Sequence, residues 1–277
     1  MEAKHSSFNL ENITVAQLKD LIAKAYGTTA EAIIGTKQYE RGVCIRPYNS
    51  TTLFSFPAKD PTNKYVRCRT PSVDSKAEKI CDVNAGSKIT VSWHESELTS
   101  SQGINPSHMG PCIVWMAPLE SNGEGEVWAK IFEDGYNPKT KTWCIDTVNK
   151  NNGTLDITIP SDVLAGKYIL RTEIIALHLA AVKFTGGKDG AEYYSNCAEI
   201  NVIGGGKTVP KGVAIPGVYT IDMPGIIFNT SAPFTSYKIP GPPVYKVGDP
   251  SGPVKPNAGV KKPCIKKRRR RQLAQNQ

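Results

Sequence analysis

Short segments of alternating hydrophobic and polar residues recur through the middle of the chain, and this period of two is typical of β-strands. One segment, 112–116, is a continuous apolar run instead, which favours a central strand. Turn residues separate the segments at the density that is typical of a β-sandwich. Six strands are expected, at 88–93, 112–116, 127–132, 155–159, 168–176 and 198–203.

The first 27 residues follow a different period. Apolar residues recur there at helical spacing, Thr14 can cap the start and Gly27 can end the segment, so we expect one helix. The apolar positions are Val15, Leu18, Leu21, Ile22 and Ala25. An early strand at 32–35 and its return at 42–47 are expected to follow.

Beyond the last predicted strand the chain loses its periodicity. Prolines are frequent from 207 to 245, and because proline donates no hydrogen bond, this part should be an extended segment lying over the sandwich. From 247 onward the composition is that of a linker. We therefore divide the chain into an atypical N-terminal segment (1–27), an all-β sandwich (28–246) and a disordered linker with a basic tail (247–277).

The net charge of +9 comes from the C-terminal tail, which carries nine cations and no acid from Val254 onward. The remaining body is formally neutral, so we expect no nucleic-acid-binding face. The run 266–271 is interpreted as a solvated terminus, with a nuclear address, a polyanion-binding patch and a dibasic processing site as alternatives. No stretch is long and apolar enough to span a membrane.

Seven dispersed cysteines without a C-x-x-C pair favour disulfides over a metal cluster, and hence an oxidising compartment. Cys264, in the tail, is the expected odd one out. Four N-glycosylation sequons also favour secretion. They begin at Asn12, Asn49, Asn152 and Asn229. The first residues contain no apolar signal-peptide core, which conflicts with a secreted protein.

Four histidines are present, and two of them lie in informative sequence surroundings. The segment 105–111, with His108, resembles the S-H-x-G-P signature of the fungal auxiliary activity family 9 lytic polysaccharide monooxygenases, formerly glycoside hydrolase family 61. The segments 171–178 and 190–202 resemble the family's strand leading to a second histidine and its tyrosine-and-cysteine strand. Further matches occur in family order at 127–133, 215–219, 224–229 and 239–242.

This resemblance implies an immunoglobulin/fibronectin-III-like β-sandwich whose long loops form a flat substrate face. It also implies one copper ion, held in the family by the amino group and imidazole of an N-terminal histidine and by a second imidazole. His108 matches that second imidazole and Tyr194 matches the axial tyrosine, while His178 matches the histidine beside the oxygen site. Cys68 and Cys197 match a disulfide pair, and Tyr237 matches an aromatic of the polysaccharide-binding face.

Two positions depart from the family pattern. Glu192 stands where glutamine is usual, and an ionised carboxylate accepts hydrogen bonds but cannot donate them. This is either a functional change or a tolerated variation. Tyr26 stands near the position expected for the N-terminal histidine, and His5 lies upstream of the predicted helix. A wrong first exon, a natural loss of the copper brace and an unrecognised cleavage remain as explanations, and the first is preferred because it also explains the missing signal peptide.

From the resemblance we expect a secreted, monomeric, copper-dependent enzyme that cleaves cellulose or related β-1,4-glucans oxidatively at C1 or C4, using O2 or H2O2 and an external electron donor. Imidazole nitrogens are suitable ligands for copper. The resemblance implies that the catalytic residues are His178, Glu192 and Tyr194. The rival is a non-catalytic polysaccharide- or copper-binding protein on the same scaffold. A hydrolase ranks last, since no carboxylate pair has support. His94 is interpreted as a surface residue at a strand end.

Overall fold

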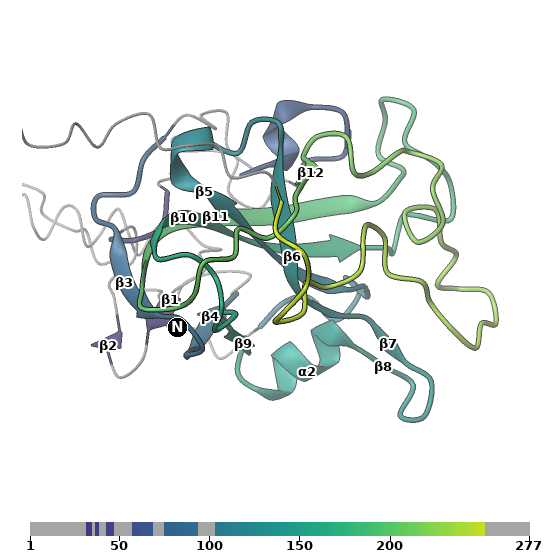
Figure 1. Ribbon diagram of the computed structural model, residues 1–277. Coiled ribbons are helices and arrows are strands. Elements are labelled where there is room, and N and C mark those ends of the chain that lie inside the picture. The colour runs from purple at the N-terminus through teal and green to yellow at the C-terminus, as the bar shows by residue number, and fades with distance from the viewer. Residues whose placement is uncertain are drawn as a thin grey trace, which may run out of the picture.

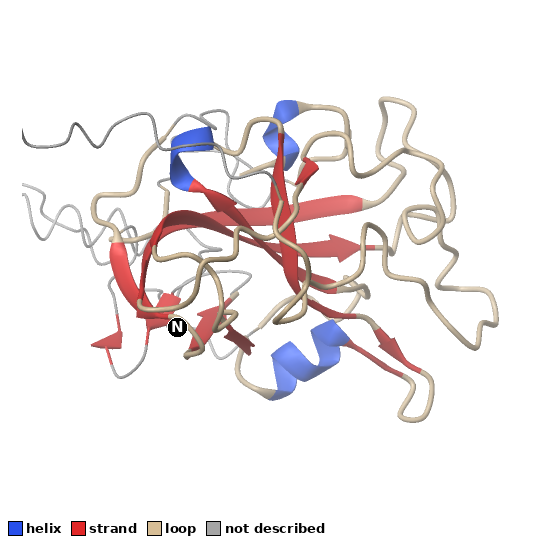
Figure 2. Ribbon diagram, viewed as in Figure 1, coloured by secondary structure: helices blue, strands red, loops and turns tan. Residues whose placement is uncertain are grey.

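The structure is a computed structural model that describes residues 32–34, 37–38, 43–46, 57–68, 75–93 and 103–252. Strands dominate it, and loops connect them into two principal sheets (Figures 1 and 2). The larger sheet has the order β12 (Val213–Ala214), β6 (Glu126–Asp134), β5 (Cys112–Pro118), β10 (Gly166–Ala176), β11 (Glu192–Ile203) and β3 (Cys81–Asn84). The smaller sheet has the order β2 (Lys37–Gln38), β1 (Ala32–Ile34), β4 (Lys88–Ser92) and β9 (Thr154–Thr158).

The two sheets pack face to face and bury a core between them, which confirms the predicted β-sandwich. Val91 of β4 and Ile157 of β9 share this core with Met116, Leu170 and other residues of the larger sheet. Alternate residues of one strand point to opposite faces, so a strand of the larger sheet can contribute to two cores.

A second core lies on the outer face of the larger sheet, where loops cover it. Trp115 and Ile113 point into it from β5, and Tyr219 and Ile226 belong to the covering loops. Both faces of β5 are therefore buried, which is the physical reason for its continuous apolar sequence. The predicted packing of the proline-rich segment is seen where Tyr245 N donates to the Lys130 carbonyl at 2.7 Å.

Small elements complete the fold. They are a hairpin of β7 (Tyr136–Asn137) and β8 (Thr142–Trp143), the α-helix α2 (Cys144–Lys150), and two 3-10 turns, η2 (Lys64–Val66) and η3 (Leu119–Ser121). Helix α2 was not predicted. None of the helices in the described ranges combines the length and apolar character that a membrane crossing requires.

The early strand is confirmed as β1, but the predicted return at 42–47 is wrong where it is described, because residues 43–46 form no regular strand and β1 pairs with β2 instead. Ile45 instead forms an isolated bridge with Ala198 of β11, and Arg46 N donates to the Cys197 carbonyl at 2.9 Å. A disulfide explains this course, because Cys44 is bonded to Cys81 of β3 and so lies at the edge of the larger sheet. The predicted helix before Gly27 lies outside the described residues.

Candidate functional site

The candidate histidines lie in two loops, one before β5 and one after β10, that meet at one end of the sandwich. His108 lies just before β5, in a turn where its backbone N–H donates to the Asn105 carbonyl at 2.9 Å. His178 lies two residues after the end of β10, and the intervening Leu177 N donates to the Met109 carbonyl at 2.8 Å. The two histidine-bearing segments are thus joined by backbone hydrogen bonds.

Gly110 allows this close approach. A Cβ atom at this position would overlap the backbone carbonyl of Ile175, so only glycine fits between the two segments. Ile175 N also donates to the Pro111 carbonyl, at 3.1 Å. The glycine of the S-H-x-G-P motif is therefore needed to dock the His108 loop onto β10.

Strand β11 supplies the remaining polar groups. It pairs antiparallel with β10, with Glu192 opposite Ala176 and Tyr194 opposite Ile174. Glu192 and Tyr194 are two residues apart, so their side chains share one face of the strand. That face is the one that His108 and His178 reach from the strand ends.

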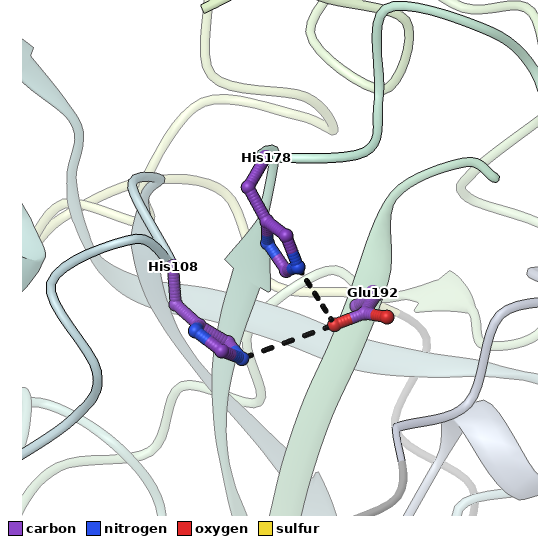
Figure 3. A group of neighbouring side chains, drawn as sticks. All are labelled: His108, His178 and Glu192. Atoms are coloured by element: carbon purple, nitrogen blue, oxygen red, sulfur yellow. Dashed lines mark ion pairs between the residues drawn. The ribbon is translucent and has the colours of Figure 1, made fainter. Parts of the chain in front are cut away.

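The side chains of His108, His178 and Glu192, here called the His–His–Glu cluster, point toward a common centre (Figure 3). Glu192 Oε2 lies 3.9 Å from His108 Nε2 and 3.6 Å from His178 Nε2. One potential ligand atom from each residue lies within 4.8 Å of the others. The two imidazole rings are 4.5 Å apart between centroids.

Tyr194 joins the cluster through its hydroxyl group. The hydroxyl donates to Glu192 Oε2 at 2.8 Å and lies 3.0 Å from His108 Nε2. Ser107 Oγ lies 3.3 Å from the other ring nitrogen of His108, Nδ1, and can accept its proton. With the proton on Nδ1, Nε2 carries the lone pair that a metal ion can take; with the proton on Nε2, that N–H donates to the Tyr194 hydroxyl.

Lys59 neutralises the charge of Glu192. Its Nζ lies 3.0 Å from Glu192 Oε1, whereas the two histidines face the other oxygen, Oε2. The ammonium group also donates to the Lys188 carbonyl. Ala58 forms a β-bridge with Tyr193, which fixes Lys59 beside β11. Lys59 was not predicted, because no motif or spacing in the sequence links it to Glu192.

A buried polar network lies on the other face of the larger sheet, where Arg171 and Glu173 of β10 point away from the face that carries Glu192 and Tyr194. Arg171 and Glu173 form an ion pair and both are fully buried. Glu173 Oε2 also accepts from Tyr219 Oη at 2.7 Å and from Trp115 Nε1 at 3.3 Å. Burial, followed by the nearby Glu173 charge, raises the pKa of the Tyr219 hydroxyl well above its ordinary value. Burial and the Glu173 charge raise the pKa of the Tyr193 hydroxyl as well.

Arg171 connects this network to the segment that carries Lys59. Its Nε and Nη2 donate to the carbonyls of Arg67 and Val66, each at 2.7 Å. Cys68 in the same segment is disulfide-bonded to Cys197 of β11, the pair that the resemblance implied. The third disulfide, Cys112–Cys144, ties β5 to helix α2.

Tyr237 lies in a separate cluster of aromatic rings with Trp143 and Phe228. Its hydroxyl donates to the Gly225 carbonyl at 2.7 Å, and burial raises its pKa well above the ordinary range. The structure therefore places Tyr237 apart from the His–His–Glu cluster and packs its ring edge to face against its neighbours. His5, Tyr26 and His94 lie outside the described residues.

The donor set can bind a transition-metal ion. Imidazole nitrogens suit copper, zinc, iron and nickel, and a carboxylate adds a negatively charged oxygen ligand. Within the described part of the chain, His178 Nδ1 is buried without a hydrogen-bond partner, so its tautomer is not fixed by a neighbouring side chain. The residues present fit copper at His108 Nε2, which faces the cluster and lies 3.0 Å from the Tyr194 hydroxyl.

Known proteins resemble this chain over most of its length. The sequence model of Auxiliary Activity family 9 (formerly GH61) matches residues 23–237. An AA9 family lytic polysaccharide monooxygenase A from Aspergillus terreus is 44% identical over 199 residues, which cover 71% of this chain and 52% of the relative. One from Aspergillus tamarii is 45% identical over 193 residues, covering 68% and 48%. The chain thus spans about half the length of the curated relatives it matches.

Solved structures agree with the sequence comparison. The structure titled CvAA9A superposes with a TM-score of 0.72 at 33% identity, covering 79% of this chain and 97% of the other. The glycoside hydrolase family 61 member Cel61B from Hypocrea jecorina superposes with a TM-score of 0.64 at 25% identity, covering 76% and 88%. The resemblance therefore extends from motifs to the arrangement of the whole sandwich.

Proposed function

The chain belongs to Auxiliary Activity family 9, and we propose that it is a copper-dependent enzyme that cleaves cellulose or a related β-1,4-glucan oxidatively. The observation that carries the proposal is the contact between His108 Nε2, in the loop before β5, and the Tyr194 hydroxyl, near the start of β11, which lie 3.0 Å apart. The relatives named above are lytic polysaccharide monooxygenases, and their names supply the reaction class.

In the proposed reaction one oxygen atom enters a C–H bond at C1 or C4 of a glucose unit, and the hydroxylated product then eliminates the neighbouring sugar. With O2 as oxidant, two electrons and two protons from an external donor reduce the second oxygen atom to water. With H2O2, water is released without further electrons. Copper, when bound, supplies the one-electron redox chemistry that this oxidation requires.

The chain's own residues would bind the copper ion and hold protons near it. His108 would bind copper through Nε2, and its ring is positioned by Ser107 and by the turn from Asn105. The Tyr194 hydroxyl keeps a proton between His108 Nε2 and Glu192 Oε2. His178 Nε2 lies 3.6 Å from the same carboxylate oxygen, so a second imidazole faces the site.

Several finer points belong to the same proposal. We propose that the protein is secreted, in keeping with the three disulfides among the described residues, and that it acts as a monomer. The electron donor is a small reductant or a dehydrogenase. Tyr237 is proposed to serve the polysaccharide-binding surface as part of its aromatic cluster, supporting neighbouring rings that sugar units can stack on.

The test is product release from cellulose with copper and ascorbate, comparing the wild type with His108→Ala and with His94→Ala as a matched control. We expect oxidised oligosaccharides from the wild type and from His94→Ala, and a loss of at least about 100-fold in His108→Ala, since removal of even an indirect partner of a metal ligand costs 10–100-fold. Equal product from His108→Ala would contradict the proposal.

A second candidate is the non-catalytic copper- or polysaccharide-binding protein. The observation that favours it is the Lys59–Glu192 ion pair, which keeps a carboxylate in place beside the proposed copper. The glutamine that is usual at this position in the family could donate a hydrogen bond there, and a carboxylate cannot. Copper binding by the wild type without any oxidised product, in the same assay, would select this candidate.

A further inference from the structure

The carboxylate of Glu192 is oriented so that its two oxygens serve different partners. Oε1 lies 3.0 Å from Lys59 Nζ, and Oε2 faces the Nε2 atoms of His108 and His178. The Glu192 side chain is about one-tenth exposed and the two histidine side chains about one-fifth. A polar group buried to this degree normally has a partner that justifies its desolvation.

We propose that Glu192 binds the metal ion directly through Oε2, together with His108 Nε2 and His178 Nε2. This inference rests on the proposed metal at His108 and deepens it. The described chain then offers two imidazoles and one carboxylate, a set that differs from the all-nitrogen brace that the resemblance implies. Glutamine, the usual family residue at this position, could not supply the negative charge.

The separations between these atoms allow a shared ion. With metal–ligand bonds of about 2.1 Å, two atoms bound to the same ion lie at most about 4.2 Å apart. The separations of 3.6 Å and 3.9 Å from Glu192 Oε2 to the two histidine nitrogens fall within this limit. They correspond to angles of roughly 120° and 135° at the ion. Three angles at one ion sum to at most 360°, so the third angle is at most about 105° and the two histidine nitrogens must then lie within about 3.3 Å of each other. These nitrogens lie within 4.8 Å in the structure, so binding of the ion would draw the two rings together.

Lys59 acts as a positioning residue in this arrangement. Its ammonium group occupies Oε1 and also donates to the Lys188 carbonyl, so the carboxylate cannot turn both oxygens toward the ion. Glu192 therefore binds through one oxygen, which leaves coordination positions open for other ligands. The hydroxyl of Tyr194, which donates to Oε2 at 2.8 Å, would hydrogen-bond to the ligating oxygen and support it.

The test measures Cu(II) binding without polysaccharide or reductant. Wild type, Glu192→Gln and Glu126→Gln are titrated with Cu(II) by calorimetry, and each Cu(II) complex is examined by electron paramagnetic resonance. Glu126 is an exposed residue at the start of β6, so Glu126→Gln is a matched control for the loss of a carboxylate charge. We expect Glu192→Gln to bind Cu(II) at least about 100-fold more weakly, beyond the 10–100-fold expected for an indirect partner.

The spectra decide whether Glu192 is a ligand. If it is, the Cu(II) spectrum of Glu192→Gln differs from that of the wild type, while the control spectrum superposes on it. His178→Ala should likewise lose one nitrogen coupling. Superposing spectra for Glu192→Gln and the wild type would overturn the inference at any affinity. Thermal unfolding without metal verifies that each variant is folded.

These outcomes separate the inference from the proposed function. If wild type binds Cu(II) and releases oxidised sugars while Glu192→Gln keeps the wild-type spectrum, only the ligand assignment fails. If wild type binds Cu(II) through Glu192 but releases no oxidised sugars, the ligand assignment stands and the proposed activity fails. If wild type binds no Cu(II), both fail.

Discussion

Replacing Glu173 by glutamine removes the charge that balances a fully buried arginine while leaving the shape of the side chain almost unchanged. Glu173 and Arg171 are each 0% exposed, so neither charge is reached by solvent in the folded protein. Glu173→Gln leaves the guanidinium of Arg171 with two backbone carbonyls, of Arg67 and Val66, but no counter-charge. It also directs an amide N–H₂ group at donors from Arg171, Tyr219 or Trp115.

Breaking a buried ion pair from one side costs about 3–5 kcal/mol in free energy of unfolding, because the remaining charge is left desolvated. For a domain of about 150–250 residues, each kcal/mol lowers the midpoint of thermal unfolding by about 2–4 °C, so a decrease of roughly 6–20 °C is expected. Asp156→Asn is the control, since its ion pair with Lys88 spans 3.4 Å between half-exposed side chains. A surface pair of this kind contributes about 0–1 kcal/mol.

Urea denaturation gives the free energy of unfolding, and calorimetry gives the midpoint. Hydrogen exchange adds a local readout, because Arg171 holds the segment at 64–68: the amides of this segment should exchange faster in Glu173→Gln than in Asp156→Asn. A Glu173→Gln protein within about 1 kcal/mol of the wild type would refute the reasoning, since it would mean that Arg171 can stay buried without its counter-charge at little cost.

Two further predictions concern the approach of His108 and the alkaline limit of stability. Gly110→Ala should destabilise the fold by several kcal/mol and weaken Cu(II) binding together with it, because the new Cβ overlaps the Ile175 carbonyl; unchanged unfolding and binding would show that the His108 loop is not docked through this glycine. Burial, with a smaller contribution from Glu120, raises the pKa of Tyr168 to about 12 from an ordinary value of 10.0. The folded state then holds this proton more tightly, so the stability is present below pH 10 and is lost between about pH 10 and 12. Tyr168→Phe should reduce that loss by roughly 3 kcal/mol, and identical pH profiles of unfolding would contradict the assignment.

The strands could be predicted from the sequence because burial on one or two faces leaves a direct record in residue order. Strand β5 is buried on both faces and reads as an uninterrupted apolar run, whereas β9 alternates because one face reaches solvent. Helix α2 was missed because its seven residues are too few for a helical period to register. The return at 42–47 was misassigned because a disulfide, and not a hydrophobic pattern, sets its course.

The candidate site was only partly predictable. His108, His178, Glu192 and Tyr194 were named through family resemblance, and the structure brings them together. Their neighbour Lys59 could not be found, since a salt bridge between distant segments leaves no local signature. The family resemblance assigned Tyr237 to a flat binding face, and that assignment stays a prediction. Its contacts within the covering loops could not be predicted, because these loops have no sequence periodicity.

The central claim is that a metal centre lies at the His–His–Glu cluster. Anomalous diffraction at the copper edge, from crystals of the copper-loaded protein, tests it by locating the copper. The account predicts one dominant peak at bonding distance, about 2 Å, from His108 Nε2. The further inference adds His178 Nε2 and Glu192 Oε2 at similar distances from that peak. A dominant peak away from His108 would contradict the account.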